Sequence, residues 1–131
     1  MPKPVILDVN AIIHFVQAFD MQKFNIIAQT LNNNQCFIPE AVITETIYVL
    51  DSVFHVSREI ISLKLKDFIS IQDNLLLEKN IIIFALNLYA SSKLDFVDCL
   101  LAGYARVNKN QIFTFDNDLK RELAEQVFRL C

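Results

Sequence analysis

A chain of 131 residues has the size of a single domain, and it is long enough to bury roughly two-thirds of the surface that its unfolded form exposes. Hydrophobic residues make up 53% of it, with 11 Phe, so its composition favours a compact core and excludes a disordered chain. Its net charge of −3, from 12 Lys and Arg against 15 Asp and Glu, argues against a protein that holds nucleic acid through a global positive field, but not against a local basic rim. We therefore expect one domain over residues 1–131.

Short apolar runs typical of buried strands alternate along the chain with longer stretches of helical spacing. The strand-like runs are residues 5–7, 36–38, 75–77, 112–115 and 127–130. The helix-like stretches are residues 22–32, 40–54, 57–71, 80–92 and 95–107. Because such an alternation is typical of parallel sheets covered on both faces, it predicts a three-layer α/β/α fold around a central, mostly parallel sheet of about five strands.

The chain has one glycine, Gly103, and it lies inside the predicted helix 95–107. Glycine inside a helix costs about 1 kcal/mol relative to alanine, so we expect close packing of this helix on the sheet to compensate. Turns are left to Asn and Asp, as in NNNQ, NKN and DND.

The cysteines and the apolar runs bear on the location of the protein. Cys36, Cys99 and Cys131 are odd in number and lack CxxC spacing, so we expect neither a disulfide framework nor a zinc site, and a cytoplasmic location. The longest apolar runs, such as IIIFAL, are far shorter than the roughly 20 residues that span a bilayer. Asp8 and His14 interrupt the region where a signal peptide would have its apolar core.

Two strand-like runs end in carboxylates. Asp8 follows VIL directly and Asn10 comes two residues later, while Asp116 and Asp118 follow IFTF. The carboxyl ends of parallel strands form the edge where open α/β sheets place their ligands, so the sequence brings Asp8 and Asp116 to one candidate site. Each of the two can equally cap the helix that follows it.

Further carboxylates lie on predicted helices. Asp95 and Asp98 are spaced i, i+3 and therefore share a helix face, and Glu45 is the only charge in VITETIYVL. Other interpretations stay open: Asp95 can serve as an N-terminal helix charge, Glu45 as a solvated position and Asp118 as a turn residue.

Carboxylates gathered at one sheet edge would repel one another and raise their pKa values unless a cation neutralised them. Oxygen ligands without nearby His or Cys suit Mg²⁺ or Mn²⁺, as a single ion or a pair. Such a centre activates water for attack on a phosphodiester, so the implied reaction is phosphodiester hydrolysis.

In chain order, these residues resemble the PIN domain family, and within it the small VapC-type toxins. The matching segments are D-x-N at Asp8 and Asn10, Glu45, D-x-x-D-C-L-L-A-x-Y-A at Asp95 and Asp98, and T-x-D at Thr114 and Asp116. The resemblance implies a metal-dependent ribonuclease in which Asp8, Glu45, Asp98 and Asp116 form an acidic quartet that binds Mg²⁺ or Mn²⁺. Asp95 and Asp118 are auxiliary acids, and Asn10 and Thr114 orient a carboxylate or a bound water by hydrogen bonding.

The chain departs from the family pattern at two positions. Phe115 stands where the family often has a basic residue, which removes one phosphate contact, and Cys99 stands where a small residue is usual. Phosphate contacts are instead expected from basic residues that flank the acidic motifs, each of which also suits a solvated surface position. These residues are Lys93, Arg106, Lys109, Lys120 and Arg121. His14 and His55 lack partners at metal spacing, and we interpret both as structural.

The resemblance also implies partners: an RNA substrate, a second copy of the chain in a homodimer, and an antitoxin protein that blocks the site in a type II toxin–antitoxin system. By analogy, helices 40–54 and 57–71 would form the walls of a groove for such a partner. Two other readings compete with the nuclease. One is a PIN-like subunit that binds RNA or protein without cleaving; the other is a phosphoryl-receiver domain, disfavoured because LLLEKN offers no central acceptor Asp.

Overall fold

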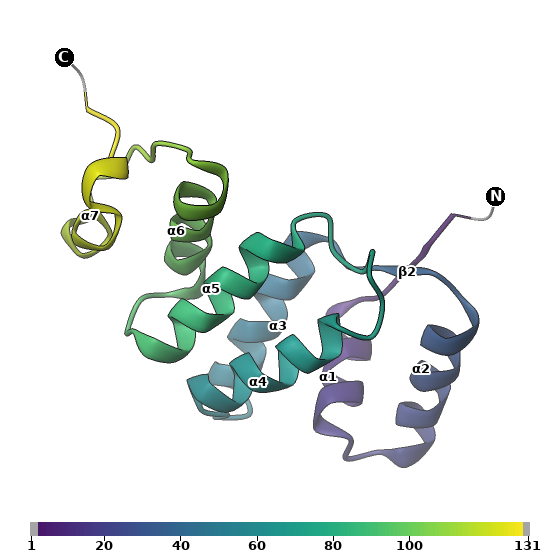
Figure 1. Cartoon of the computed structure of the whole chain (residues 1–131). Helices are drawn as coiled ribbons and strands as arrows, with labels where there is room; N and C mark the ends of the chain where they lie inside the picture. The colour runs from purple at the N-terminus through teal and green to yellow at the C-terminus, as the bar shows by residue number, and fades with distance from the viewer. Residues whose placement is uncertain (1–2, 130–131) are drawn as a thin grey trace. The chain divides into compact units, whose positions relative to one another are not determined.

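The computed structural model describes residues 3–129, which divide into two compact units, one up to Lys79 and one from Asn80 onwards (Figure 1). The elements of the first unit are β1 Val5–Ile6, α1 Val9–Gln17, α2 Met21–Asn33, β2 Cys36–Phe37, α3 Glu40–Ser52 and α4 Arg58–Ile69. Those of the second are α5 Lys79–Ser91, α6 Phe96–Asn108, α7 Asn117–Leu123 and a 3₁₀ turn, Ala124–Gln126. The expectation of one domain stays a prediction.

The five predicted helices are confirmed as α2 to α6, with ends within three residues of those expected. Side-chain caps explain where several of the helices begin. Asp8, Asp20, Ser57 and Asp116 each accept a hydrogen bond from the backbone N–H three residues later, at 2.8, 3.1, 3.3 and 2.9 Å. Helix α3 instead begins directly after Pro39, whose fixed φ suits a helix start.

The sheet of the first unit is short. β1 and β2 pair in parallel with Val5 opposite Cys36, and Leu7 N–H extends the ladder to the Phe37 carbonyl at 3.1 Å. The expected strand 75–77 is not regular: one backbone hydrogen bond, from Ile38 N–H to the Leu75 carbonyl at 2.8 Å, lies beside β2. The apolar run LLL is not buried throughout, because Leu77 is 84% exposed just before α5 begins.

The expected strand 112–115 is reduced to a single parallel bridge between Ile112 and Val127. No regular strand continues after Ile112. Phe113 and Phe115 are 62% and 84% exposed, and the Thr114 hydroxyl accepts a hydrogen bond from Asp116 N–H at 3.0 Å. Leu130, in the expected strand 127–130, and Cys131 lie outside the described residues. Among residues 3–129, regular strand is therefore confined to β1 and β2, fewer than the five expected.

The core of the first unit forms around α1, which packs against α2, α3 and α4. Phe15 of α1 stacks on Phe24 of α2 with ring centroids 4.6 Å apart, and it meets Phe68 of α4 edge to face at 5.2 Å. Ile12 and Ile13 are buried on the same helix. These contacts fix the faces that α1 and α2 turn toward each other.

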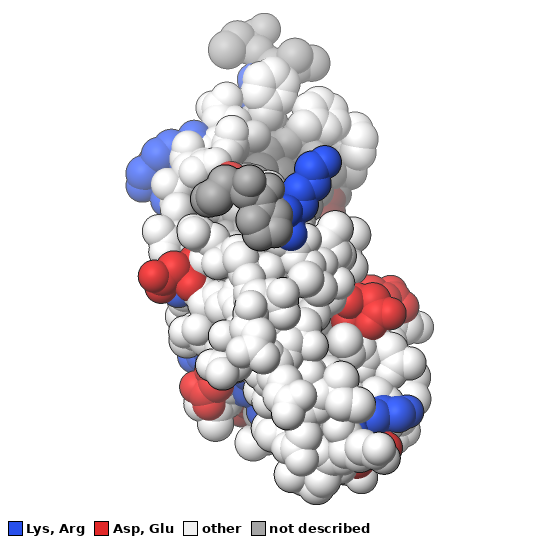
Figure 2. All heavy atoms as spheres, turned by 90° about the vertical axis from the view of Figure 1, so that its right-hand side faces the viewer, with Lys and Arg blue, Asp and Glu red and all other residues white. Residues whose placement is uncertain are grey.

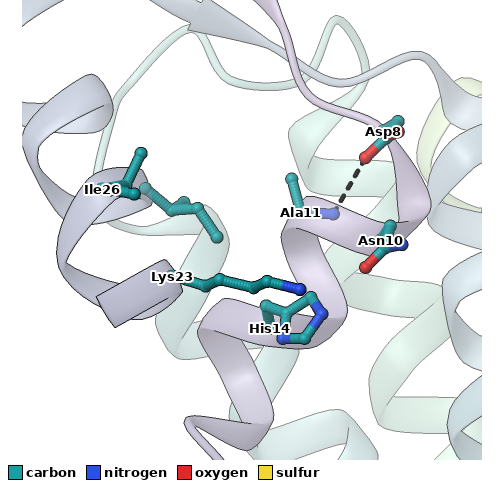
Figure 3. A pocket seen from close by; sticks show the side chains of 7 residues that line it. Asp8, Asn10, Ala11, His14, Lys23 and Ile26 are labelled. Atoms are coloured by element: carbon teal, nitrogen blue, oxygen red, sulfur yellow. Dashed lines mark hydrogen bonds between the residues drawn. The ribbon is translucent and has the colours of Figure 1, made fainter. Parts of the chain in front are cut away.

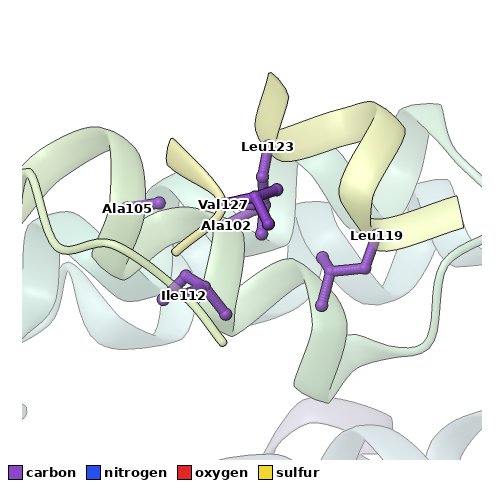
Figure 4. Close-up of a cluster of buried hydrophobic side chains, with 6 residues drawn as sticks. All are labelled: Ala102, Ala105, Ile112, Leu119, Leu123 and Val127. Carbon is purple, nitrogen blue, oxygen red and sulfur yellow. The ribbon is translucent and has the colours of Figure 1, made fainter. Parts of the chain in front are cut away.

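The second unit has a core cluster between α6 and the C-terminal segment (Figure 4). Its members are Ala102, Ala105, Ile112, Leu119, Leu123 and Val127. Two side-chain hydrogen bonds also join α6 to the C-terminal segment. The Arg106 guanidinium donates to the Glu122 carbonyl at 2.6 Å, and the Gln126 amide donates to the Ala105 carbonyl at 2.7 Å. The end of α7 and the turn that follows it are thereby held against α6.

Gly103 marks a close approach of two helices. A Cβ at this position would lie 3.0 Å from both the carbonyl oxygen and the Cγ2 of Ile81. The expected close packing is present, but α6 packs here against α5 and not against the sheet. The absence of a Cβ lets the two helix backbones approach each other.

Replacing Gly103 with alanine is expected to destabilise the protein. Alanine would gain about 1 kcal/mol of helix propensity, but the carbonyl of Ile81 belongs to a helix and cannot move aside cheaply, so we expect a net loss of about 1–3 kcal/mol. Urea denaturation measures the change.

Val107→Ala, at an exposed position of the same helix, is the matched control and should change the free energy of unfolding by less than about 0.5 kcal/mol. A Gly103→Ala protein as stable as the wild type would contradict the close packing of α5 and α6.

Candidate functional site

The acidic residues of the first unit lie on helices that follow its strands. Asp8 is exposed just after the buried Leu7, and its Oδ1 accepts the Ala11 N–H as the N-cap of α1 (Figure 3). Asn10, the second residue of α1, is also exposed. Glu45 faces solvent from the middle of α3, next to Thr46, whose buried hydroxyl donates to the Val42 carbonyl at 2.7 Å.

A pocket of about 330 Å³ opens between α1 and α2 at the Asp8 end. Its lining consists of Asp8, Asn10, Ala11, His14, Lys23, Ile26 and Ile27. Sequence reasoning treated His14 as structural and did not single out Lys23. One signal was available, because Lys23 lies in the first turn of α2, where the macrodipole disfavours a cation.

The acidic residues of the second unit gather at the starts of α6 and α7. Asp95 is the N-cap residue of α6 but makes no side-chain capping bond, and Asp98 lies partly buried in its first turn. Asp116 caps α7. Burial raises the pKa of the Asp98 carboxyl, and the negative charges of Asp116 and Asp95 raise it further. Asp98 is therefore close enough to Asp116 and to Asp95 for their charges to repel its own.

Two opposing effects act on the pKa of Asp98: the helix dipole on one side, and burial with charge repulsion on the other. The first turn of a helix favours a negative charge and would lower the pKa of a carboxyl. The pKa is raised nonetheless, so desolvation and repulsion by Asp116 and Asp95 outweigh the helix dipole at this position. Asp118 differs from these acids: it is exposed and pairs with Arg121 one turn along α7.

The donor chemistry of this acidic group fits a hard divalent cation, because carboxylate oxygens that repel one another are stabilised by Mg²⁺ or Mn²⁺. Across residues 3–129, however, no three or more Asp, Glu, His or Cys side chains stand close enough together to enclose a metal. Mg²⁺ does not require such a cage, since it commonly keeps several waters and uses one or two protein carboxylates.

The basic residues expected to contact phosphate have varied surroundings. Arg106 is bound to the Glu122 carbonyl and Arg121 to Asp118, whereas Lys93 and Lys109 are exposed and Lys120 is partly buried. The face shown in Figure 2 carries its Lys and Arg in separate groups among uncharged side chains. Any phosphate contact on that face is therefore local and not part of a continuous basic surface.

We expect Asp98→Asn to stabilise the protein at neutral pH and in the presence of chelator. The folded state raises the pKa of Asp98 above its ordinary value of 3.8. Stability from this group is thus complete below that value and is lost as the pH rises through the folded pKa. Asparagine cannot ionise, so thermal unfolding at pH 7 should show a Tm about 1–2 °C higher than the wild type, a small rise because the group is only partly buried.

The gain should vanish near pH 3.5, where wild-type Asp98 is itself mostly protonated. Asp73→Asn, at an exposed carboxylate of the first unit, serves as the control and should leave the Tm unchanged. A lower Tm for Asp98→Asn at pH 7 would contradict the repulsion.

Comparison with known proteins gives one match: the model of the PIN domain family matches residues 5–122. No curated protein and no solved structure matches the chain at a significant level. The matched span runs from β1 into α7 and includes Asp8, Glu45, Asp98 and Asp116. The resemblance to the PIN domain family is thereby confirmed, together with the three-layer α/β/α fold class and a nuclease-type, hydrolytic function, while the VapC-type assignment stays a prediction. The chain belongs to the PIN domain family, whose members are generally metal-dependent nucleases.

Proposed function

We propose that this protein is a Mg²⁺- or Mn²⁺-dependent endoribonuclease and the toxin of a type II toxin–antitoxin system in the cytoplasm. The observation that carries the catalytic part is the acidic group at the starts of α6 and α7, where burial, Asp116 and Asp95 together raise the pKa of Asp98. A partly buried carboxylate repelled by neighbouring carboxylates is a costly arrangement for a protein without a cation to bind. The order of the motifs supports the VapC-type assignment.

In this proposal Asp8, Glu45, Asp98 and Asp116 hold the metal, with Asp95 as an auxiliary acid. When bound, the metal would activate water and neutralise the charge that develops on the phosphate. Asp8 and Asp116 each use one carboxylate oxygen as a helix cap, which leaves acceptor sites on the other oxygen. The Thr114 hydroxyl holds the backbone N–H of Asp116 and so fixes the position of its carboxylate.

A protein partner is proposed from the surface of the first unit. Large apolar side chains of α3, α4 and the segment between them are exposed, among them Tyr48, Val53, Ile60 and Leu63. A second hollow of about 420 Å³ is lined mainly by apolar side chains, Val53 among them, together with Asn10 and His14. Exposed apolar surface is typical of interaction sites in small soluble proteins, so this part of the first unit suits an antitoxin segment or a second copy of the chain.

The nuclease is tested by RNA cleavage with Mg²⁺ or Mn²⁺ and with chelator. We expect Asp98→Asn and Asp116→Asn each to lower the cleavage rate by at least about 100-fold, beyond the 10–100-fold typical of losing a residue that only supports a metal ligand. The folded state should persist in both, since asparagine at position 116 can still accept the capping bond.

Asp73→Asn, which changes the net charge by the same amount, is the control for general electrostatic effects and should cleave like the wild type. Cleavage by the wild type in the presence of chelator, or full activity of Asp98→Asn, would rule out the proposed centre.

The alternative is a PIN-like subunit that binds RNA or protein without cleaving. It is favoured by the lack of a metal-enclosing group of three acids among the described residues. Millimolar Mn²⁺ distinguishes the two functions, because a metal that binds the folded state raises its stability by about 2.7 kcal/mol at 100 times the Kd. A Tm unchanged by Mn²⁺, in a protein that binds RNA, would favour the alternative.

A further inference from the structure

The pocket between α1 and α2 is lined by polar and apolar side chains on both helices. Helix α1 contributes Asn10, Ala11 and His14, and helix α2 contributes Lys23, Ile26 and Ile27. Figure 3 shows the Lys23 side chain extending from α2 toward the His14 ring on α1. Asp8 lies at one end of the same pocket and is a proposed metal ligand.

Two polar groups of the pocket have unmet bonding capacity. The Nδ1 atom of His14 is buried and has no hydrogen-bond partner among the described residues. This leaves Nε2 as the ring nitrogen that a ligand can reach, since the ring makes no other hydrogen bond in residues 3–129. The Lys23 ammonium likewise has no ion pair or hydrogen bond with any described residue. Unmet donors side by side in a concave site are typical of a ligand pocket.

The position of Lys23 is unfavourable without a ligand. A cation in the first turn of a helix opposes the macrodipole. An anion bound in the pocket would reverse that balance, because both the Lys23 charge and the N-terminal end of α2 would then attract it. Lys23 and His14 therefore favour an anionic ligand.

We propose that this pocket binds one nucleotide of single-stranded RNA. The Lys23 ammonium and the His14 Nε2 contact its phosphate, and Ile26 and Ile27 pack against its ribose or base. The proposal rests on the proposed function, because RNA is the proposed substrate and Asp8, a proposed metal ligand, lines the same pocket. A volume of about 330 Å³ suits a single nucleotide and not a longer segment.

The test measures binding of a labelled single-stranded RNA of about 12 nucleotides by fluorescence anisotropy. Chelator is present throughout, so that neither cleavage nor metal binding contributes. One lost phosphate contact on a single strand lowers the slope of log K against log salt by about 0.7, which corresponds to roughly fivefold weaker binding at 0.1 M salt. We expect this change for Lys23→Gln and recovery with Lys23→Arg.

Lys66→Gln is the matched control, since it removes the same charge from α4 and lies outside the pocket lining. It should keep wild-type affinity and slope. His14→Gln should also weaken RNA binding. The His14 ring packs edge to face on Phe19, so the Tm of the His14→Gln variant is measured as well. This measurement separates a loss of folding from a lost contact with RNA.

The proposed RNA pocket would be contradicted if Lys23→Gln bound RNA as well as the wild type, or if Lys66→Gln lost as much affinity. It would also be contradicted if the wild-type chain did not bind RNA. These results are separable from the nuclease test. If Asp98→Asn loses cleavage while Lys23→Gln binds normally, the nuclease stands and the pocket fails. If the wild type never cleaves but Lys23→Gln binds RNA weakly, the pocket stands and the nuclease fails.

Discussion

The first N–H groups of a helix need hydrogen-bond partners from outside the helix, and in α1 and α7 a carboxylate supplies one of them. Asp8 and Asp116 each follow an apolar segment and each bind the N–H three residues later. Capping and metal binding are usually weighed as competing explanations of such residues. They are compatible here, because a carboxylate offers about four acceptor sites and a cap uses one. The cap also holds the side chain in one orientation, so a ligand finds the second oxygen already placed.

Asp98 differs from these capping residues, because its ionised carboxylate lowers the stability of the folded state. Its pKa is raised by burial and by Asp116 and Asp95, so ionised Asp98 weakens the folded state at neutral pH. The surrounding packing maintains this arrangement: Gly103 lets α6 approach α5, and Arg106 and Gln126 fasten α6 to the C-terminal segment. Residues that break the local rules of stability while their surroundings are well packed are typical of functional sites.

Five of the helices, α2 to α6, were predictable from sequence, whereas α1, α7 and most of the sheet were not. Helical periodicity over a dozen residues is a strong signal, and α2 to α6 lie close to the ranges it predicts. Runs of three or four apolar residues carry much less information. Leu77 and Phe113 look in sequence like buried strand residues, yet both are exposed, because strand formation depends on a partner that the run itself does not specify. Gly103 was correctly linked to close packing, but its partner, Ile81, lies on another helix.

The candidate site follows the same division. Residues at the ends of apolar runs, such as Asp8 and Asp116, could be proposed as site residues because their position within one element is informative. The pocket was missed because it depends on how two helices face each other. Phe15 stacks on Phe24, and this contact turns the preceding residues of the two helices, His14 and Lys23, toward one hollow. The chain therefore uses one aromatic contact both to close the core of the first unit and to bring two nitrogen-bearing side chains together beside Asp8.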